Sequence, residues 1–212
     1  MIKLNLYLKF FFLVKTFIIC LLVCFKSYAD DIVMKKKFIV IGSNEAIVKI
    51  KIFSSLTCPH CANFHIKVVP KIKKEYIESG KVQLIFIDFP LDQAAFNASK
   101  LLHCADEKKQ IEFLDTIYET QNKWTNGSTI EDINKNLKSI VKNLGISSTQ
   151  FDKCLIDEVV SDKLLNARIE AAKKYSINST PTIIINEKKL EGSVSFENIK
   201  KKNRKNYLTY EV

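Results

Sequence analysis

The most constraining feature of this chain is a pair of cysteines placed where a strand gives way to a helix. Ile47–Phe53 is rich in β-branched residues, which predicts a strand, and the pattern over 59–77 is helical until Gly80 ends it. Cys58-Pro59-His60-Cys61 joins the two elements, and the fixed φ of proline suits the first helical position. The chain must therefore fold so that both sulfurs lie in the first turn of a helix that follows a strand.

The rest of the pattern predicts an α/β fold with a helical insertion. Val82–Asp88 is a nearly continuous apolar run, typical of a strand covered on both faces, and Thr182–Asn186 predicts another strand that leads into a hairpin and a closing helix over 195–203. The stretch between them carries no strand signal. Its expected helices lie at 92–105, 109–122, 130–143, 149–156 and 158–175. We therefore expect a mixed sheet flanked by helices, with an inserted all-helical subdomain.

These breaks divide the chain into four parts. We expect a signal peptide at 1–29, the first part of the α/β domain at 30–90, the helical insertion at 91–175 and the second part of the α/β domain at 176–212.

Residues 1–29 have the features of a secretion signal. They contain lysines and no acid, and their apolar run, Thr16–Phe25, is only half of the roughly 20 residues that a bilayer span needs. Small residues at the end of the segment favour cleavage after Ala29, and hence export to the periplasm. Two alternatives stay open: residues 10–25 could form an uncleaved anchor, and Leu21–Cys24 faintly resembles a lipoprotein box.

The positive charge does not point to nucleic acid. The chain has 33 basic and 23 acidic residues, a formal net charge of +10, but only Arg168 and Arg204 are arginines, the residue best suited to phosphate. The lysines are spread over the whole length, and no nucleic-acid-binding motif accompanies them. We expect a solvated lysine-rich surface and no nucleic-acid partner.

The position of Cys58 predicts redox chemistry. A sulfur in the first turn of a helix lies beside N–H groups without partners and the positive end of the helix dipole, which favours the thiolate. His60 can stabilise the thiolate further when it is protonated. A stabilised reduced form makes the disulfide a better oxidant. The predicted chemistry is therefore the donation of the Cys58–Cys61 disulfide to a substrate dithiol.

The cysteine motif also permits two other interpretations, a metal site and a structural disulfide. The cysteine pair could be half of a zinc or copper site, with partners among His60, His65, His103, Cys104 and Cys154, but a second CxxC is missing from the sequence. It could also be a structural disulfide. His65 lies four residues after Cys61 on the same helix face and could line the site, but we expect it to be a packed or exposed histidine.

Cys104 and Cys154 are the remaining cysteines after residue 29. An even number of cysteines in an exported chain fits an oxidising compartment. We predict a structural disulfide between them, and the alternative is two buried free thiols.

Three stretches together resemble the DsbA-like thiol:disulfide oxidoreductases, which have a thioredoxin-like fold with an inserted helical domain. The first runs from Ile41 to Cys61 (IGSNEAIVKIKIFSSLTCPHC) and is similar to the first strands and the active site of that family. The second runs from Ile177 to Gly192 (INSTPTIIINEKKLEG) and is similar to its cis-proline loop and hairpin. The helical stretch between them resembles the inserted domain, so the resemblance covers nearly all of the chain after residue 29.

The resemblance implies a role for each residue of the site. Cys58 would be the attacking nucleophile and Cys61 the resolving cysteine, with Pro59 and His60 completing the catalytic motif. Thr180 and Pro181 would form the cis-proline loop that binds the substrate backbone.

The resemblance also implies partners. We expect an exported dithiol oxidase that acts on reduced or unfolded exported proteins, is reoxidised by a membrane-bound partner, and uses no cofactor and no metal. Residues 30–45 are too short for the additional domain of dimeric isomerases, so we expect a monomer. A disulfide isomerase or reductase stays an alternative, as does an exported metal-binding protein.

The strand before the motif departs from the family. Several thioredoxin-fold enzymes carry a buried acid there, but Lys49–Phe53 contains no carboxylate. The proton of Cys61 must therefore pass to another group, and Asp88 and water are both open candidates.

Overall fold

The computed structural model describes residue 15 and residues 38–208. The chain divides into two units, Met1–Phe38 and Ile39–Val212, and the second contains the α/β fold. The predicted signal peptide, residues 1–29 with cleavage after Ala29, lies outside the described residues apart from Lys15 and stays a prediction. None of the described helices is long and apolar enough to cross a bilayer.

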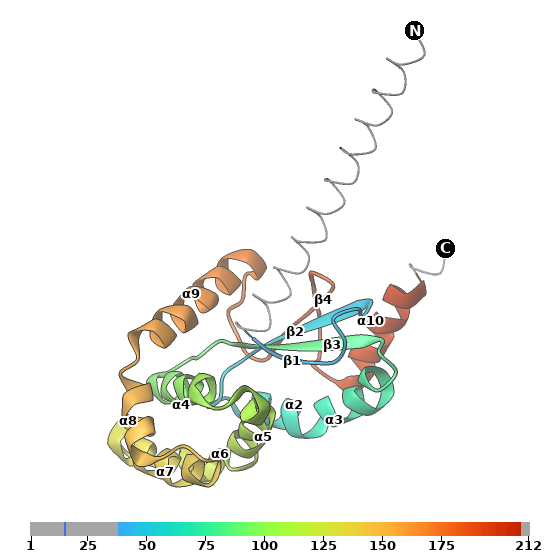
Figure 1. Ribbon diagram of the computed structural model, residues 1–212. Helices are drawn as coiled ribbons and strands as arrows, with labels where there is room; N and C mark the ends of the chain where they lie inside the picture. The colour runs from blue at the N-terminus through green and yellow to red at the C-terminus, as the bar shows by residue number, and fades with distance from the viewer. Residues whose placement is uncertain (1–14, 16–37, 209–212) are drawn as a thin grey trace. The chain divides into compact units, whose positions relative to one another are not determined.

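Within residues 38–208, a five-stranded mixed sheet forms the centre of the second unit (Figure 1). Its strands are β1 (Ile39–Ile41), β2 (Val48–Ser54), β3 (Val82–Asp88), β4 (Thr182–Ile185) and β5 (Lys188–Lys189), in the order β1-β3-β2-β4-β5. Strands β2 and β3 are parallel, and the other neighbouring pairs are antiparallel. The expected mixed sheet is confirmed, and β2, the strand that leads into the cysteine motif, lies in its middle.

The side chains of β2 alternate between two covered faces of the sheet. Val48, Ile50 and Ile52 are at most 1% exposed and belong to the same core as the helix that carries Cys61. Phe53 points to the opposite face, where its ring centroid lies 5.6 Å from that of Tyr175. Burial on both faces explains why the β2 sequence is so rich in β-branched and aromatic residues.

The helix expected over 59–77 is interrupted. Helix α2 covers Pro59–Lys67, α3 covers Val69–Ile72, and a π-helical turn follows at Lys73–Ile77. Pro70 has no N–H to donate to the carbonyl one turn earlier, and its ring crowds that carbonyl, so the regular α-helix ends beside Val68. The closing helix, α10, spans Phe196–Leu208 and is longer than expected.

Between β3 and β4 the described residues form helices joined by loops and no strand, as expected. Its helices are α4 (Gln93–Cys104), α5 (Gln110–Glu119), α6 (Gln121–Trp124), α7 (Ile130–Asn143), α8 (Ser148–Leu155) and α9 (Glu158–Tyr175), with a 3-10 turn at Glu107–Lys109. Trp124 is fully buried there, and its indole N–H donates to the carbonyl of Ile117 at 2.9 Å. The predicted division of the chain into parts at 30–90, 91–175 and 176–212 stays a prediction.

A disulfide joins two helices of this block. Cys104, the last residue of α4, is bonded to Cys154 of α8, and their Cα atoms are 6.2 Å apart. The Lys100 ammonium donates to the carbonyl of Leu155 at 2.6 Å beside it. The end of α4 is thus tied to α8 by a covalent bond and by a polar contact.

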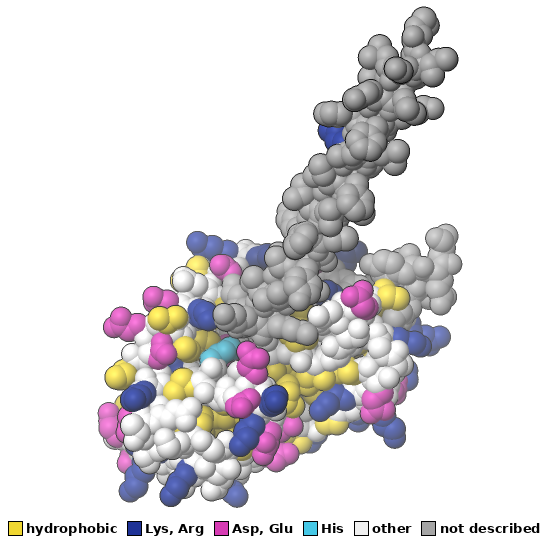
Figure 2. Space-filling view, viewed as in Figure 1, with side chains coloured by type: hydrophobic (Ala, Val, Ile, Leu, Met, Phe, Trp, Pro, Cys, Tyr) yellow, Lys and Arg dark blue, Asp and Glu magenta, His cyan; other side chains and the backbone are white. Residues whose placement is uncertain are grey.

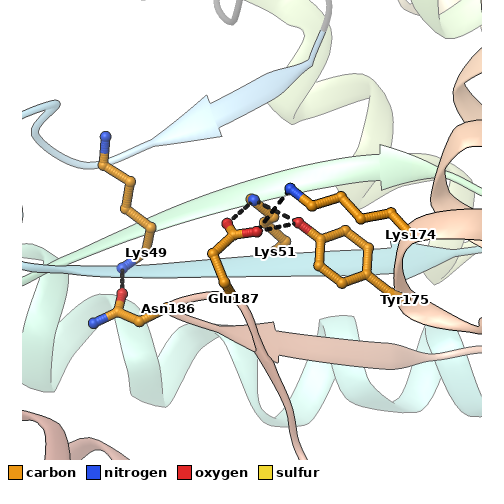
Figure 3. A network of polar contacts seen from close by, with 6 residues as sticks. All are labelled: Lys49, Lys51, Lys174, Tyr175, Asn186 and Glu187. Atoms are coloured by element: carbon orange, nitrogen blue, oxygen red, sulfur yellow. Dashed lines mark hydrogen bonds and ion pairs between the residues drawn. The ribbon is translucent and has the colours of Figure 1, made fainter.

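A network of polar contacts fixes the end of α9 against the sheet (Figure 3). The carboxylate of Glu187, in the turn after β4, forms ion pairs with Lys51 of β2 and with Lys174 of α9, the latter at 2.9 Å. The Tyr175 hydroxyl donates to the same carboxylate at 2.5 Å and accepts from Lys51 at 2.9 Å. One carboxylate therefore connects the middle of the sheet, the end of α9 and the hairpin turn.

Asn186 fastens the hairpin at a second point (Figure 3). Its side-chain oxygen accepts from the backbone N–H of Lys49 at 2.8 Å. Asn186 and Glu187 both have positive φ angles, 44° and 66°, which asparagine tolerates better than most residues. Both ends of the segment between α9 and the hairpin, which contains Thr180-Pro181, are therefore anchored to β2.

Charges of both signs are mixed on the surface. Figure 2 shows Lys, Arg, Asp and Glu side chains interspersed on the face in view, around hydrophobic side chains near its middle. This distribution agrees with a solvated charged surface better than with a single-sign patch for a polyanion.

We expect Glu187→Gln to lower the free energy of unfolding by about 1 kcal/mol at neutral pH, because a side chain that is 54% exposed is well screened by solvent. Burial raises the pKa of Glu187, but hydrogen bonds from Lys174, Lys51 and Tyr175 outweigh this and lower it to about 2. The Glu187 carboxylate therefore binds a proton less readily in the folded state than in the unfolded state. Wild type loses the contribution of ionised Glu187 to the free energy of unfolding as the pH falls from about 4.5 to about 2.

Urea unfolding at several pH values measures this effect. The difference between wild type and Glu187→Gln should shrink over that range. Glu191→Gln, in which an exposed carboxylate without an ion pair among the described residues is removed, should show no such trend. A pH-independent difference for Glu187→Gln would contradict the prediction.

We expect the Cys104–Cys154 bridge in freshly purified protein, and we expect it to resist reduction better than the Cys58–Cys61 pair. A crosslink across 50 residues stabilises a fold by about 4 kcal/mol in the chain-entropy model. Mass mapping of unreduced peptides tests for the bond directly, and the Cys104→Ala/Cys154→Ala variant measures its stabilisation. Recovery of both cysteines in alkylated form without reduction would rule the bridge out.

Candidate active site

Strand pairing brings the two predicted halves of the site together. Strands β2 and β4 are antiparallel, with Phe53 opposite Thr182, so the loop before β4 lies beside the loop after β2. The thiol of Cys58 donates to the backbone carbonyl of Thr180, 3.4 Å away, and the Thr180–Pro181 peptide bond is cis. Residues 122 positions apart in the chain thus form one site.

The two sulfurs of the motif have different environments. Both cysteines are free thiols, but Cys58 is 9% exposed as the N-cap residue of α2, whereas Cys61 is 1% exposed inside the first turn. Burial raises the pKa of Cys61 to about 12, and contacts with Thr180 and Ser55 only partly oppose this. Cys61 is therefore held as a thiol at neutral pH, while Cys58 can be reached by another sulfur.

Pro59 and His60 are exposed beside the sulfurs. Pro59 occupies the first position of α2, as expected. The His60 imidazole makes no hydrogen bond to any described residue, so it is free to face a substrate. Its catalytic role stays a prediction.

The helical block holds the loop that leads into Cys58. The Gln121 side chain of α6 donates to the carbonyls of Leu56 and Cys58, at 2.7 and 3.1 Å. The Thr57 hydroxyl donates to Asp92, the N-cap residue of α4, at 2.6 Å. Neither Gln121 nor Asp92 is predicted from the sequence as a site residue; for Asp92, the capping pattern at the start of α4 is a local signal.

Asp88 lies at the end of β3 with both of its carboxylate oxygens engaged. One accepts from the Ser99 hydroxyl at 2.6 Å and the other from His103 at 2.8 Å. Burial lowers the pKa of His103, but the hydrogen bond to Asp88 and the charge of Asp88 outweigh this and raise it above its ordinary value. Asp88 is thus committed to a structural ion pair, which weakens it as a proton acceptor for Cys61.

The candidate metal ligands do not come together. Within residues 38–208 and at residue 15, no group of three or more His, Cys, Asp or Glu side chains could hold a metal ion. His65 is bonded to Asp115, His103 is bonded to Asp88, and Cys104 is joined to Cys154. The geometry instead suits thiol–disulfide exchange, in which an accessible sulfur is attacked and a buried sulfur leaves.

Known proteins are similar to this chain over most of its length. A family model described as Thioredoxin matches residues 35–202. A Bacillus cereus relative named "Probable disulfide bond formation protein D" is 32% identical over 152 residues, which cover 69% of this chain and 68% of the relative. "Disulfide bond formation protein D" of Bacillus subtilis is 25% identical over 169 residues, 76% of this chain and 73% of the relative. The crystal structure of Wolbachia pipientis alpha-DsbA1 has a TM-score of 0.73 and 28% identity, over 81% of this chain and 92% of that one.

We expect iodoacetamide to modify Cys58 of the reduced protein much faster than Cys61. The reagent reacts with thiolates, and Cys61 is both buried and held protonated by a pKa of about 12. Peptide mass spectrometry over a time course at pH 7 gives the order of labelling. The Cys58→Ser variant is the control and should stay largely unlabelled at Cys61, whereas faster labelling of Cys61 would reverse the assignment of the two sulfurs.

Proposed function

Because this chain belongs to the thioredoxin family and is a DsbA-like thiol:disulfide oxidoreductase, we propose that it is an exported dithiol oxidase. It would donate the Cys58–Cys61 disulfide to dithiols of newly exported proteins. The asymmetry of the two sulfurs carries this proposal, because Cys58 lies at a helix start and Cys61 is buried in the first turn.

The exchange takes place in two steps. A substrate thiolate attacks Cys58 Sγ, the Cys58–Cys61 bond breaks, and Cys61 leaves with the electron pair and takes up a proton. A second substrate thiolate then attacks the substrate sulfur of the mixed disulfide, and Cys58 leaves as a thiolate. The substrate loses two electrons and the Cys58–Cys61 pair gains them. The helix N-terminus favours the anion on Cys58, which makes Cys58 the better leaving group in the second step.

A protein substrate has two features to bind beside Cys58. The backbone of Thr180 and Pro181 lies next to the sulfur, where an extended chain could pair with it. A hollow of about 310 Å³ lies between the loop after β3 and α9, and Leu91 and Leu165, which line it, are 47% and 43% exposed. Asp92, also on its wall, contacts Thr57 just before Cys58. We propose that apolar side chains of unfolded substrates enter this hollow.

The cellular setting is part of the same proposal. Residues 1–29 support export to the periplasm with cleavage after Ala29. Reduced Cys58 and Cys61 must then be reoxidised, and we propose a membrane-bound partner for that step. We propose that the protein works as a monomer without a cofactor.

We expect the Cys58–Cys61 pair to have a reduction potential nearer to about −120 mV, typical of strong oxidants, than to about −270 mV, typical of thioredoxin. Equilibration of the protein with glutathione redox buffers, followed by alkylation and mass analysis, measures it. His60→Ser should make the potential more reducing, because it removes a group that can stabilise the Cys58 thiolate. Asn63→Ser, an exposed change in the same helix, is the matched control.

The measured potential also separates the alternatives. A value near that of thioredoxin would indicate a reductase and would contradict the oxidase proposal. An intermediate value near about −180 mV, together with activity on scrambled disulfides, would indicate an isomerase.

A further inference from the structure

Several buried polar atoms have no hydrogen-bond partner among the described residues, and the Thr180 hydroxyl at the site is one of them. Two others are Nδ1 of His65 and the hydroxyl of Tyr118. A buried polar group without a partner costs free energy, so such atoms are rare in folded proteins and call for an explanation. Both of these lie behind the active site, on the helix that carries Cys61 and on the helix packed against it.

The geometry places His65 close to the reacting sulfurs. His65 follows Cys61 by one helical turn, and both side chains are on the buried face of α2. The imidazole ring lies 4.8 Å from the Tyr118 ring of α5 and 5.6 Å from Phe86 of β3. Burial raises the pKa of Tyr118 well above its ordinary value, so its hydroxyl stays protonated beside the imidazole.

Asp115 determines which nitrogen of His65 carries the proton. His65 Nε2 and Asp115 Oδ1 are 2.6 Å apart. An ionised carboxylate only accepts hydrogen bonds, so Nε2 carries the hydrogen and Nδ1 of the neutral ring has a free lone pair. This pairing of histidine with a carboxylate is the arrangement that orients general bases in other enzymes. The Asp115 side chain is 44% exposed, so the pair also has contact with solvent.

Cys61 needs such a base. Its thiol does not ionise readily at neutral pH, and the strand beside it offers Lys49 and Lys51 in place of a carboxylate. Asp88 already accepts hydrogen bonds from Ser99 and His103 on its two oxygens. His65 has an unused lone pair on the buried face of α2 that carries Cys61, whereas His60 is exposed on the other side of the motif.

We propose that His65, oriented by Asp115, exchanges a proton with Cys61, which lies one helical turn earlier on the same buried face. The proposal rests on the proposed function, because it supplies the proton step of that disulfide exchange. When the enzyme is reoxidised, the Cys61 proton passes to His65 Nδ1 and the Cys61 electron pair attacks Cys58 Sγ in the mixed disulfide. The bond from Cys58 to the partner breaks, and the partner sulfur leaves with its electron pair. When a substrate is oxidised, the imidazolium returns the proton to the leaving Cys61 sulfur.

Stopped-flow kinetics separates this step from the others. Mixing the reduced protein with excess oxidised glutathione gives a bimolecular phase, in which Cys58 forms the mixed disulfide, and then a unimolecular phase, in which Cys61 closes the ring. We expect His65→Gln to slow the second phase by about 100-fold, as expected for loss of a general base, and to leave the first phase unchanged. The reduction potential should stay the same, because the group speeds both directions equally.

Matched variants distinguish proton exchange from packing. Asp115→Asn should slow the second phase by about 10-fold. Because this side chain is half-exposed, the variant should fold and can test the proposal even if His65→Gln does not fold. Glu119→Gln removes an exposed carboxylate from the same helix and should have no effect. In His65→Ala, imidazole in the buffer should restore the second phase, which a purely structural role of His65 would not allow.

Several outcomes would overturn the proposal. An unchanged second phase in His65→Gln would do so, as would equal slowing of both phases without rescue by imidazole. Slowing in Asp88→Asn but not in Asp115→Asn would assign the proton to Asp88 instead. Failure of the oxidase proposal is distinguishable from these outcomes. It would appear as a wild-type reduction potential near that of thioredoxin, while His65→Gln would still slow the second phase.

Discussion

The active site depends on the antiparallel pairing of β2 with β4. This pairing sets Phe53 opposite Thr182 and so brings the carbonyl of Thr180 within 3.4 Å of the Cys58 sulfur. A slip by one residue would turn the side chains of β4 to the wrong faces of the sheet and move the loop away from α2. The contacts of Glu187 with Lys51, Lys174 and Tyr175 fix this register from the other end of β4. The reactive sulfur is therefore positioned by the sheet as much as by its own helix.

The chemistry follows from where each sulfur lies in the first helical turn. Cys58 is the N-cap residue of the helix and is 9% exposed, whereas Cys61 is one turn further on and is 1% exposed in the core. Burial in this turn raises the pKa of the Cys61 thiol to about 12, so an anion on that sulfur is suppressed. An exchange reaction gains direction from this difference, because an incoming thiolate can reach only one of the two sulfurs.

The sequence predicts what depends on neighbouring residues and misses what depends on folding. The strands, most helices and the two cysteines of the motif were predictable because periodicity and the helix start are local features. The break beside Val68 also has a local signal, because Pro70 lies inside the predicted helix. The apolar pattern over 59–77 nevertheless predicts one continuous helix. Contacts such as Gln121 with Leu56, or His65 with Asp115, join residues 50 to 65 positions apart, and no spacing rule connects them before the fold is known.

The helical block takes part in the site as well as covering it. Gln121 of α6 holds the carbonyls around Cys58, and Asp115 and Tyr118 of α5 meet His65 behind Cys61. Lys51, on the strand that leads into the cysteine motif, is engaged with Glu187 on the face of the sheet away from Cys61. If His65 exchanges the Cys61 proton as proposed, the carboxylate that assists it comes from the inserted helices. The proton step then draws on α2 and α5, and the charge of Lys51 on β2 serves to anchor the hairpin turn after β4.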